Sequence, residues 1–172
     1  MTTTRLFLVP ATLPMLDAIA DADWAALSNL LGGADIADHW NHFPDAMLWI
    51  RNYMREHSGE MGWWTYLILH RRDVRLIGTC GYKGAPTPAG EVEIGYEIAD
   101  AYQGQGLATE AARALTARAF EYETVKTVLA HTLPEENASE AVLRKLGFAF
   151  AGEVFDVDDG TIWRWQVNRP IQ

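Results

Sequence analysis

The clearest alternation of apolar and polar residues lies at residues 91–98, which read EVEIGYEI. Val92, Ile94, Tyr96 and Ile98 fall on one face, and the glutamates and Gly95 fall on the other, which predicts a half-buried strand. Similar β-type runs predict further strands at residues 4–9, 63–70, 74–84 and 124–132, and in two segments of the tail around the turn Asp158-Asp159-Gly160.

Helical spacing of apolar residues alternates with these runs. It predicts one broken helix or two short ones between Thr12 and the Gly32-Gly33 pair, and helices over residues 46–57, 107–121 and 138–147. Gly59 and Gly62 are expected to end the helix over residues 46–57. Residues 34–44 have no helical or strand period and predict a loop. The order predicts an α+β (mixed α/β) fold, in which helices cover both faces of a mixed sheet.

Composition narrows the class of protein. The 172 residues suit one domain, residues 1–172, and the formal charge of −9 disfavours a nucleic-acid partner but suits an amine-bearing substrate. A single cysteine, Cys80, excludes an internal disulfide and makes a reducing, cytoplasmic location the default expectation. Pro10, Pro14 and Asp17 interrupt the apolar start, so neither a signal core nor a membrane span is expected.

The segment YQGQGLATEAARAL, residues 102–115, places Gly104 and Gly106 between a predicted strand and a predicted helix. Unpaired amides at a helix start attract phosphate where glycine lets the backbone come close. A plain turn is the alternative. A dinucleotide fingerprint is disfavoured, because Thr109 stands where the third glycine belongs and His131 ends the next strand in place of an acidic residue.

Residues 103–108, QGQGLA, resemble the Q/R-x-x-G-x-G/A motif of the GNAT superfamily of N-acetyltransferases. The string GYEIADAYQGQGLATEA and the later NASEAVLRKLGF are similar to the branch of the ribosomal-protein N-terminal acetyltransferases (RimJ/RimL). The resemblance implies a GNAT fold, with a sheet of about seven mostly antiparallel strands, and direct acetyl transfer from acetyl-coenzyme A to a primary amine, either a protein N-terminus or a small molecule.

The resemblance also implies where the cofactor binds. The pantetheine arm would pair with residues 92–99, the amide of Ile98 would polarise the thioester carbonyl, and the pyrophosphate would lie over the loop. The residues expected to bind the cofactor are Ile98, Gln103, Gly104, Gln105, Gly106, Ala108, Thr109 and Asn137. Two positions depart from the family pattern: Asn137 stands two residues before Ser139 rather than three, with Glu136 in the expected place, and Leu143 replaces a common tyrosine.

Three residues are candidates for proton transfer. Glu93 and Glu97 lie on one side of their strand, roughly 13 Å apart at ~3.3 Å per residue, so they cannot serve one nitrogen together. Glu93 matches a glutamate frequent in the branch, and burial would raise its pKa, whereas Glu97 or a water chain is the alternative base. Ser139 is the candidate acid, placed near the sulfur by the resemblance; alone, it would predict a helix cap.

The acceptor side is less defined. The segment HWNHF, residues 39–43, and the pair Trp63-Trp64 are expected either to line the acceptor pocket or to pack as loop aromatics, and no metal is expected because no third ligand accompanies His39 and His42. Trp163 and Trp165 are expected in the core or in a homodimer interface. A non-catalytic acyl-coenzyme A sensor, or transfer of another acyl group, remains the alternative function.

Overall fold

The computed structural model describes residues 1–57 and 62–170, and the expected end of a helix at Gly59 lies outside them. The strands are β1 (Leu6–Pro10), β2 (Asp35–Ile36), β3 (Thr65–His70), β4 (Arg75–Tyr82), β5 (Glu91–Ile98), β6 (Thr127–Thr132), β7 (Ala149–Asp156) and β8 (Gly160–Asn168). The helices are α1 (Leu13–Ala20), α2 (Trp24–Leu30), α3 (Pro44–Glu56), α4 (Leu107–Phe120) and α5 (Ala138–Lys145), with a 3₁₀ turn at Asp100–Tyr102.

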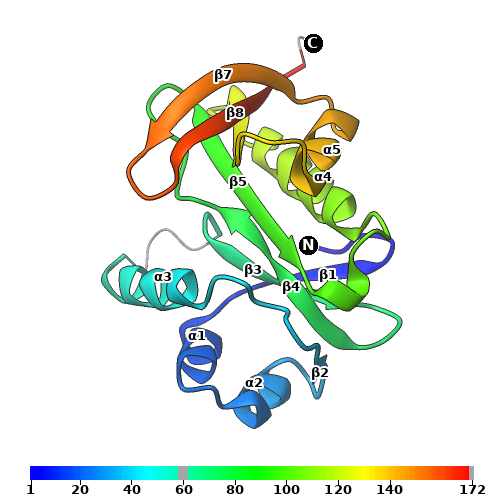
Figure 1. Ribbon diagram of the computed structural model, residues 1–172. Coiled ribbons are helices and arrows are strands. Elements are labelled where there is room, and N and C mark those ends of the chain that lie inside the picture. Colours follow the sequence, from blue (N-terminus) through cyan, green and yellow to red (C-terminus); the bar gives the residue numbers. More distant parts are fainter. Residues whose placement is uncertain (58–61, 171–172) are drawn as a thin grey trace.

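The strands form one open, mostly antiparallel sheet with the order β1-β3-β4-β5-β6-β8-β7, and β2 pairs with β4 off this path (Figure 1). Two pairs are parallel, β5 with β6 and β2 with β4. Because β5 is antiparallel to β4 and parallel to β6, it joins the two halves of the sheet. The mixed α/β class is therefore confirmed.

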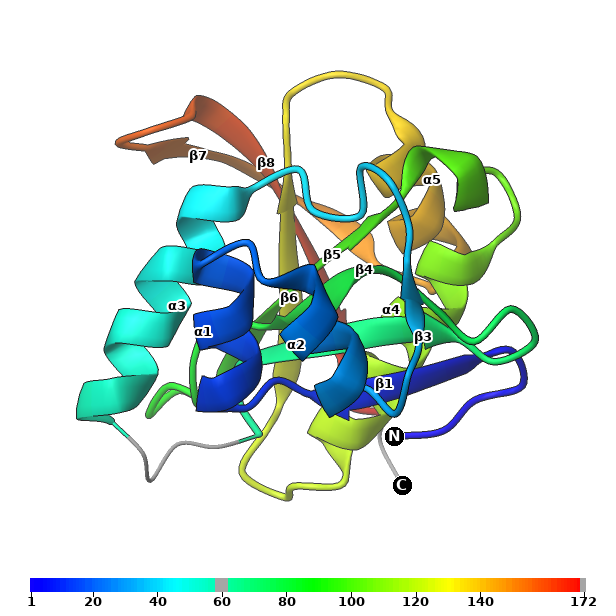
Figure 2. The same cartoon turned by 90° about the horizontal axis from the view of Figure 1, so that it is seen from below.

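Helices cover both faces of the sheet, as the sequence predicts. α1, α2 and α3 gather on one side, where α1 packs on both of the others, and α4 and α5 lie on the opposite side (Figures 1 and 2). Helix α4 has no Gly or Pro and packs on β5 and β1 through a stripe of small and apolar residues. The buried members of this stripe are Leu107, Ala111, Ala112, Leu115 and Ala119.

The local chemistry explains most element boundaries. The first helical region is two helices because the side chain of Asp23 caps α2 by accepting a hydrogen bond of 2.9 Å from the amide of Ala26. The seven predicted strands are present, and β5 alternates as expected, with Val92, Ile94 and Ile98 buried. Strand β2 is an additional strand within the segment predicted as a loop. The sequence did not predict it because its two residues are too few to show a period.

The core is continuous across the sheet and includes Cys80 and Trp165, which are 3% and 1% exposed. The indole of Trp165 donates a 3.1 Å hydrogen bond to Thr132 Oγ1, so this tryptophan is a core residue. No helix among the described residues has the length and apolar character that a bilayer span needs.

Close packing of β4 against the start of β3 generates a stability prediction. A Cβ added at Gly81 would lie 2.3 Å from the carbonyl oxygen of Trp64, whereas one at Gly95, its cross-strand partner, would meet nothing within 4 Å. We expect Gly81→Ala to lower the free energy of unfolding by roughly 2 kcal/mol or more and the Tm by about 4–8 °C. Gly95→Ala is the matched control and should leave Tm nearly unchanged; equal Tm values for both variants would contradict the packing argument.

Candidate active site

Strand β5 leaves β6 after a short pairing. The parallel register joins Glu91, Val92 and Glu93 to residues 127–129, and in the described chain it does not continue along residues 94–98, which pair only with β4. The remaining backbone groups of β5 on the β6 side therefore form an edge without a strand partner. An extended chain can add to such an edge by backbone hydrogen bonds.

The hydrogen-bond alternation fixes which residues supply this edge. The amide of Ala99 donates to the Ile77 carbonyl at 2.7 Å, and the amide of Lys83 donates to the Glu93 carbonyl at 2.9 Å. Odd-numbered residues of β5 therefore direct their backbone groups to β4, so the even-numbered ones direct theirs to the opposite edge. Ile98 is one of them, and its carbonyl accepts a 3.0 Å hydrogen bond from Gln103 Nε2. The amide predicted to polarise a carbonyl thus lies on the unpartnered edge.

The loop between β5 and α4 has the geometry of an anion site. Gly106 is the N-cap of α4 with φ +76°, Gly104 has φ +72°, and no side chain caps the helix, so its first amides are available to a ligand. Residues 103–106 are exposed, and Ala108 and Thr109 are half-buried in the first turn. The side chain of Gln105 turns back to the Ala101 carbonyl at 3.2 Å, and that of Gln103 to Ile98, so both support the loop.

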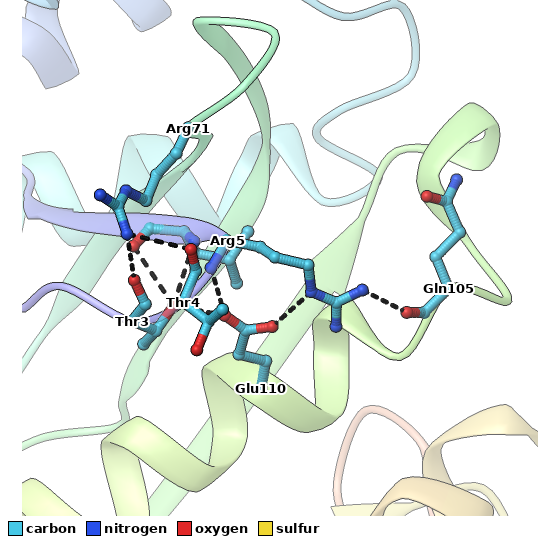
Figure 3. Close-up of polar contacts among 7 residues, drawn as sticks. Thr3, Thr4, Arg5, Arg71, Gln105 and Glu110 are labelled. Atoms are coloured by element: carbon cyan, nitrogen blue, oxygen red, sulfur yellow. Dashed lines mark hydrogen bonds and ion pairs between the residues drawn. The ribbon is translucent and has the colours of Figure 1, made fainter.

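A clamp from the start of the chain holds this loop (Figure 3). Glu110, in the first turn of α4, accepts hydrogen bonds from the Arg5 amide and Nε, both at 2.7 Å, and from Thr3 Oγ1 at 2.6 Å. Burial works to raise the pKa of Glu110, but the bonds from Thr3 and Arg5 outweigh it and hold the pKa below its ordinary value. The ionised carboxylate therefore fixes Arg5 against the helix.

The other end of Arg5 sets the orientation of one peptide. Its Nη1 donates to the carbonyl oxygen of Gln105 at 2.8 Å. Because C=O and N–H point in opposite directions across a trans peptide, the amide of Gly106 points away from Arg5. Arg5 is thus a positioning residue for the loop. Sequence reasoning missed it, since nothing in the local pattern relates it to a motif one hundred residues later.

The face of β5 that points away from α4 contacts the segment from His39 to Phe43. Both carboxylate oxygens of Glu97 are engaged, because Thr79 Oγ1 and the His42 amide each donate to one of them at 2.7 Å. Asp100 contacts both predicted histidines, with His39 Nδ1 at 2.9 Å and His42 Nε2 at 3.6 Å. These contacts hold the segment on the sheet, and the structure gives Glu97 an anchoring role.

The aromatic residues predicted for the acceptor pocket divide between core and surface. Trp40 and Trp64 are buried, and Trp64 packs against Trp49 and Tyr53 of α3 with ring centroids 5.5 and 4.5 Å apart. Phe43 is 65% exposed. Among the described residues, no group of three or more His, Cys, Asp or Glu side chains is arranged to hold a metal ion.

Glu93 lies where β5 and β6 separate. Its Oε1 is 3.0 Å from His131 Nδ1 and 2.5 Å from Lys83 Nζ. Burial works to raise the pKa of Glu93, but the contacts with His131 and Lys83 outweigh it, and the pKa lies below its ordinary value. The expected upward shift was therefore wrong in direction, because Lys83 and His131, which come from other parts of the chain, both stabilise the ionised carboxylate. Glu93 is a carboxylate at neutral pH.

The N-terminus of α5 is capped by Asn137 rather than by Ser139. Asn137 is the N-cap, and its Oδ1 accepts a 3.0 Å hydrogen bond from the Glu140 amide, so Ser139 does not serve as the cap. The hydroxyl of Tyr96 donates to the Ser139 carbonyl at 3.2 Å, and burial raises the pKa of Tyr96 well above its ordinary value. A protonated hydroxyl thus adjoins Ser139, while Leu143 is fully buried.

The contacts of Arg5 with Glu110 and Gln105 predict how a substitution of Arg5 changes the affinity for coenzyme A. Arg5→Lys keeps the charge but lacks the planar fork that reaches both Glu110 and the Gln105 carbonyl. We expect coenzyme A to bind roughly tenfold more weakly by calorimetry, a loss of about 1.4 kcal/mol. Arg72 lines the same cavity of about 620 Å³ beside the clamp, so Arg72→Lys is the matched control and should bind normally. Wild-type affinity in Arg5→Lys would contradict the role of the clamp.

Comparison with known proteins agrees with this geometry. YjdG of Bacillus subtilis (strain 168), an uncharacterized N-acetyltransferase, is 29% identical over 148 residues, which are 85% of this chain and 87% of YjdG. The structure of RimL, a ribosomal L7/L12 alpha-N-protein acetyltransferase in complex with coenzyme A, superposes with a TM-score of 0.68 at 17% identity and covers 98% of this chain and 96% of RimL.

A chimera of the spermidine N-acetyltransferase SpeG from Vibrio cholerae shares the fold with a TM-score of 0.69 at 15% identity, over 96% of both chains. Residues 5–149 match the acetyltransferase (GNAT) domain family. This match covers most of the chain, including the β5–β6 separation and the loop before α4. The chain therefore belongs to the GNAT family of acetyltransferases.

Proposed function

We propose that this acetyltransferase transfers the acetyl group of acetyl-coenzyme A directly to a primary amine. The observation that carries the proposal is the unpartnered edge of β5 leading into the loop before α4. The edge offers amides to an extended pantetheine chain, and the loop offers amides to a pyrophosphate. The glycines fit this ligand, because both adopt left-handed backbone in an exposed loop, and a Cβ built at Gly104 would meet nothing within 4 Å.

The cofactor would supply an activated acetyl group, and the chain's own residues would bind and orient it. Ile98 would donate its amide to the thioester carbonyl. The amide of Gly106, oriented by Arg5, would donate a hydrogen bond to the pyrophosphate. The other amides of the loop and of the first turn of α4 would do the same. Asn137 would act through the start of α5, which it caps.

Direct attack is supported by the state of the only cysteine. Cys80 is buried in β4, and burial raises the pKa of its thiol far above the ordinary value. A thiol that stays protonated and inaccessible is a poor nucleophile, so an acyl-cysteine intermediate is disfavoured. The amine itself would then attack the thioester.

The acceptor class follows from charge. The odd-numbered face of β5 carries Glu93 and Glu97, and the chain as a whole has a formal charge of −9. Such a surface attracts a cationic amine. RimL acts on a protein N-terminus and SpeG on spermidine, by their names, so we propose a protein N-terminus or a small polyamine-like amine.

The proposed function predicts release of free coenzyme A thiol when a suitable amine is added. Peptides with different N-terminal residues and a panel of small amines should be compared at equal concentration with acetyl-coenzyme A, and the acetylated product confirmed by mass spectrometry. Turnover is expected for one of the two classes. Tight binding of acetyl-coenzyme A with no thiol release for any amine would favour the sensor function instead.

The loop geometry predicts the effect of a bulky residue at Gly106. A β-branched side chain is strained at φ +76°, so Gly106→Val should distort the loop and raise the KM for acetyl-coenzyme A at least tenfold. Gly33 has φ +84° in open space beyond α2, so Gly33→Val carries similar strain away from the loop. Steady-state kinetics should show a normal KM for the control; an equally normal KM for Gly106→Val would rule out the loop as the pyrophosphate site.

A further inference from the structure

Two titratable side chains meet at the point where β5 and β6 separate. Glu93 pairs in register with Leu129, where the pairing of the two strands ends in the described chain, and His131 follows two residues later on β6. Residues two apart on a strand share a face, so Glu93 and His131 project to the same side of the sheet. This is also the side of Glu97 and the segment 39–43.

The contact between them fixes the tautomer of the histidine. Glu93 is ionised, and a lone pair on Nδ1 would be repelled by the carboxylate oxygen 3.0 Å away, so the neutral imidazole carries its proton on Nδ1. The neutral imidazole then has its lone pair on Nε2. Nε2 makes no hydrogen bond within the described chain, and the side chain is 18% exposed. Nε2 is therefore a basic nitrogen without a hydrogen-bond partner among the described residues, on a side chain that is partly exposed.

We propose that His131, oriented by Glu93, accepts the proton of the attacking amine. The inference rests on the acetyl-transfer function proposed above. The amine nitrogen forms a bond to the thioester carbon, its proton passes to His131 Nε2, and the carbon–sulfur bond breaks. Coenzyme A leaves as a thiolate that takes up a proton, which balances the proton that His131 returns to solvent.

This assignment accounts for both glutamates. Glu93 contacts Lys83 and His131 through the same oxygen, and its lowered pKa makes it a weak base, so it acts as a positioning residue. Glu97 anchors Thr79 and the His42 amide through both of its oxygens. Neither carboxylate is therefore as well placed to take the proton as the unpaired nitrogen of His131.

The charges around His131 come from four elements. Glu93 lies on β5, Lys83 follows β4, and Asp156, which interacts electrostatically with both His131 and Lys83, ends β7. Arg164 on β8 is the cross-strand partner of His131 and pairs with Glu91 at 2.8 Å. Glu93 is the anion in direct contact, so removing its charge should favour the neutral imidazole over the imidazolium.

The test uses pH profiles of kcat for the wild type, His131→Gln and Glu93→Gln, with the amine found by the thiol-release screen. We expect the wild type to lose activity as pH falls and the imidazole is protonated. His131→Gln should lower kcat roughly 100-fold and abolish this acidic limb. Glu93→Gln should move the limb to lower pH. Glu91→Gln is the matched control, since it removes a carboxylate from the same face without contact to His131, and it should leave the limb in place.

A second readout separates this inference from the function on which it rests. The ¹⁵N chemical shifts of His131, measured with coenzyme A bound, should show the Nδ1–H tautomer in the wild type and its loss in Glu93→Ala, which has neither the charge nor an acceptor oxygen. Retention of kcat within threefold in His131→Gln, or an Nε2–H tautomer, would overturn the role of His131. If the tautomer is as expected but no amine is acetylated, the acetyl-transfer function fails, and the base role fails with it.

Discussion

The separation of β5 from β6 is the constraint on which the site depends. A parallel pair normally satisfies the backbone groups of both strands, and groups left without partners are tolerated only where water or a ligand can reach them. Here the pairing ends at Glu93, while β5 continues to Ile98 along β4. One edge therefore offers amides to a ligand, and its two ends lead to the loop before α4 and to the contact between Glu93 and His131.

Much of the fold follows from local patterns. The alternation in residues 91–98 and the break at Gly32 and Gly33 identify elements that the structure contains, because one sheet face or one helix face is buried in each. The glycines of the loop also signal their role, since left-handed backbone at Gly104 and Gly106 favours glycine. Strand β2 left no such signal, because two residues cannot show a period.

The supporting residues of the site could not be predicted in the same way. Arg5 reaches the loop only because β1 lies beside the start of α4, and this proximity is a property of the tertiary structure (Figure 3). The pKa of Glu93 depends on Lys83 and His131, which precede and follow it in the chain and meet it across the sheet. For Asn137, the offset from the family pattern coincides with its use as the cap of α5.

The charge distribution poses a physical problem, because an acidic protein must bind a polyanionic cofactor. Backbone amides and the dipole of α4 attract phosphate without adding formal charge. Arg5, the cation beside the loop, is neutralised by Glu110, so its contribution is orientation of the Gly106 amide rather than net attraction. The carboxylates of Glu93 and Glu97 lie on the other face of β5, away from α4. The anionic cofactor is thus attracted on the α4 side of β5, and a cationic amine on the side of Glu93 and Glu97. The acetyl group would be transferred at the end of the unpartnered edge of β5, where β5 and β6 separate.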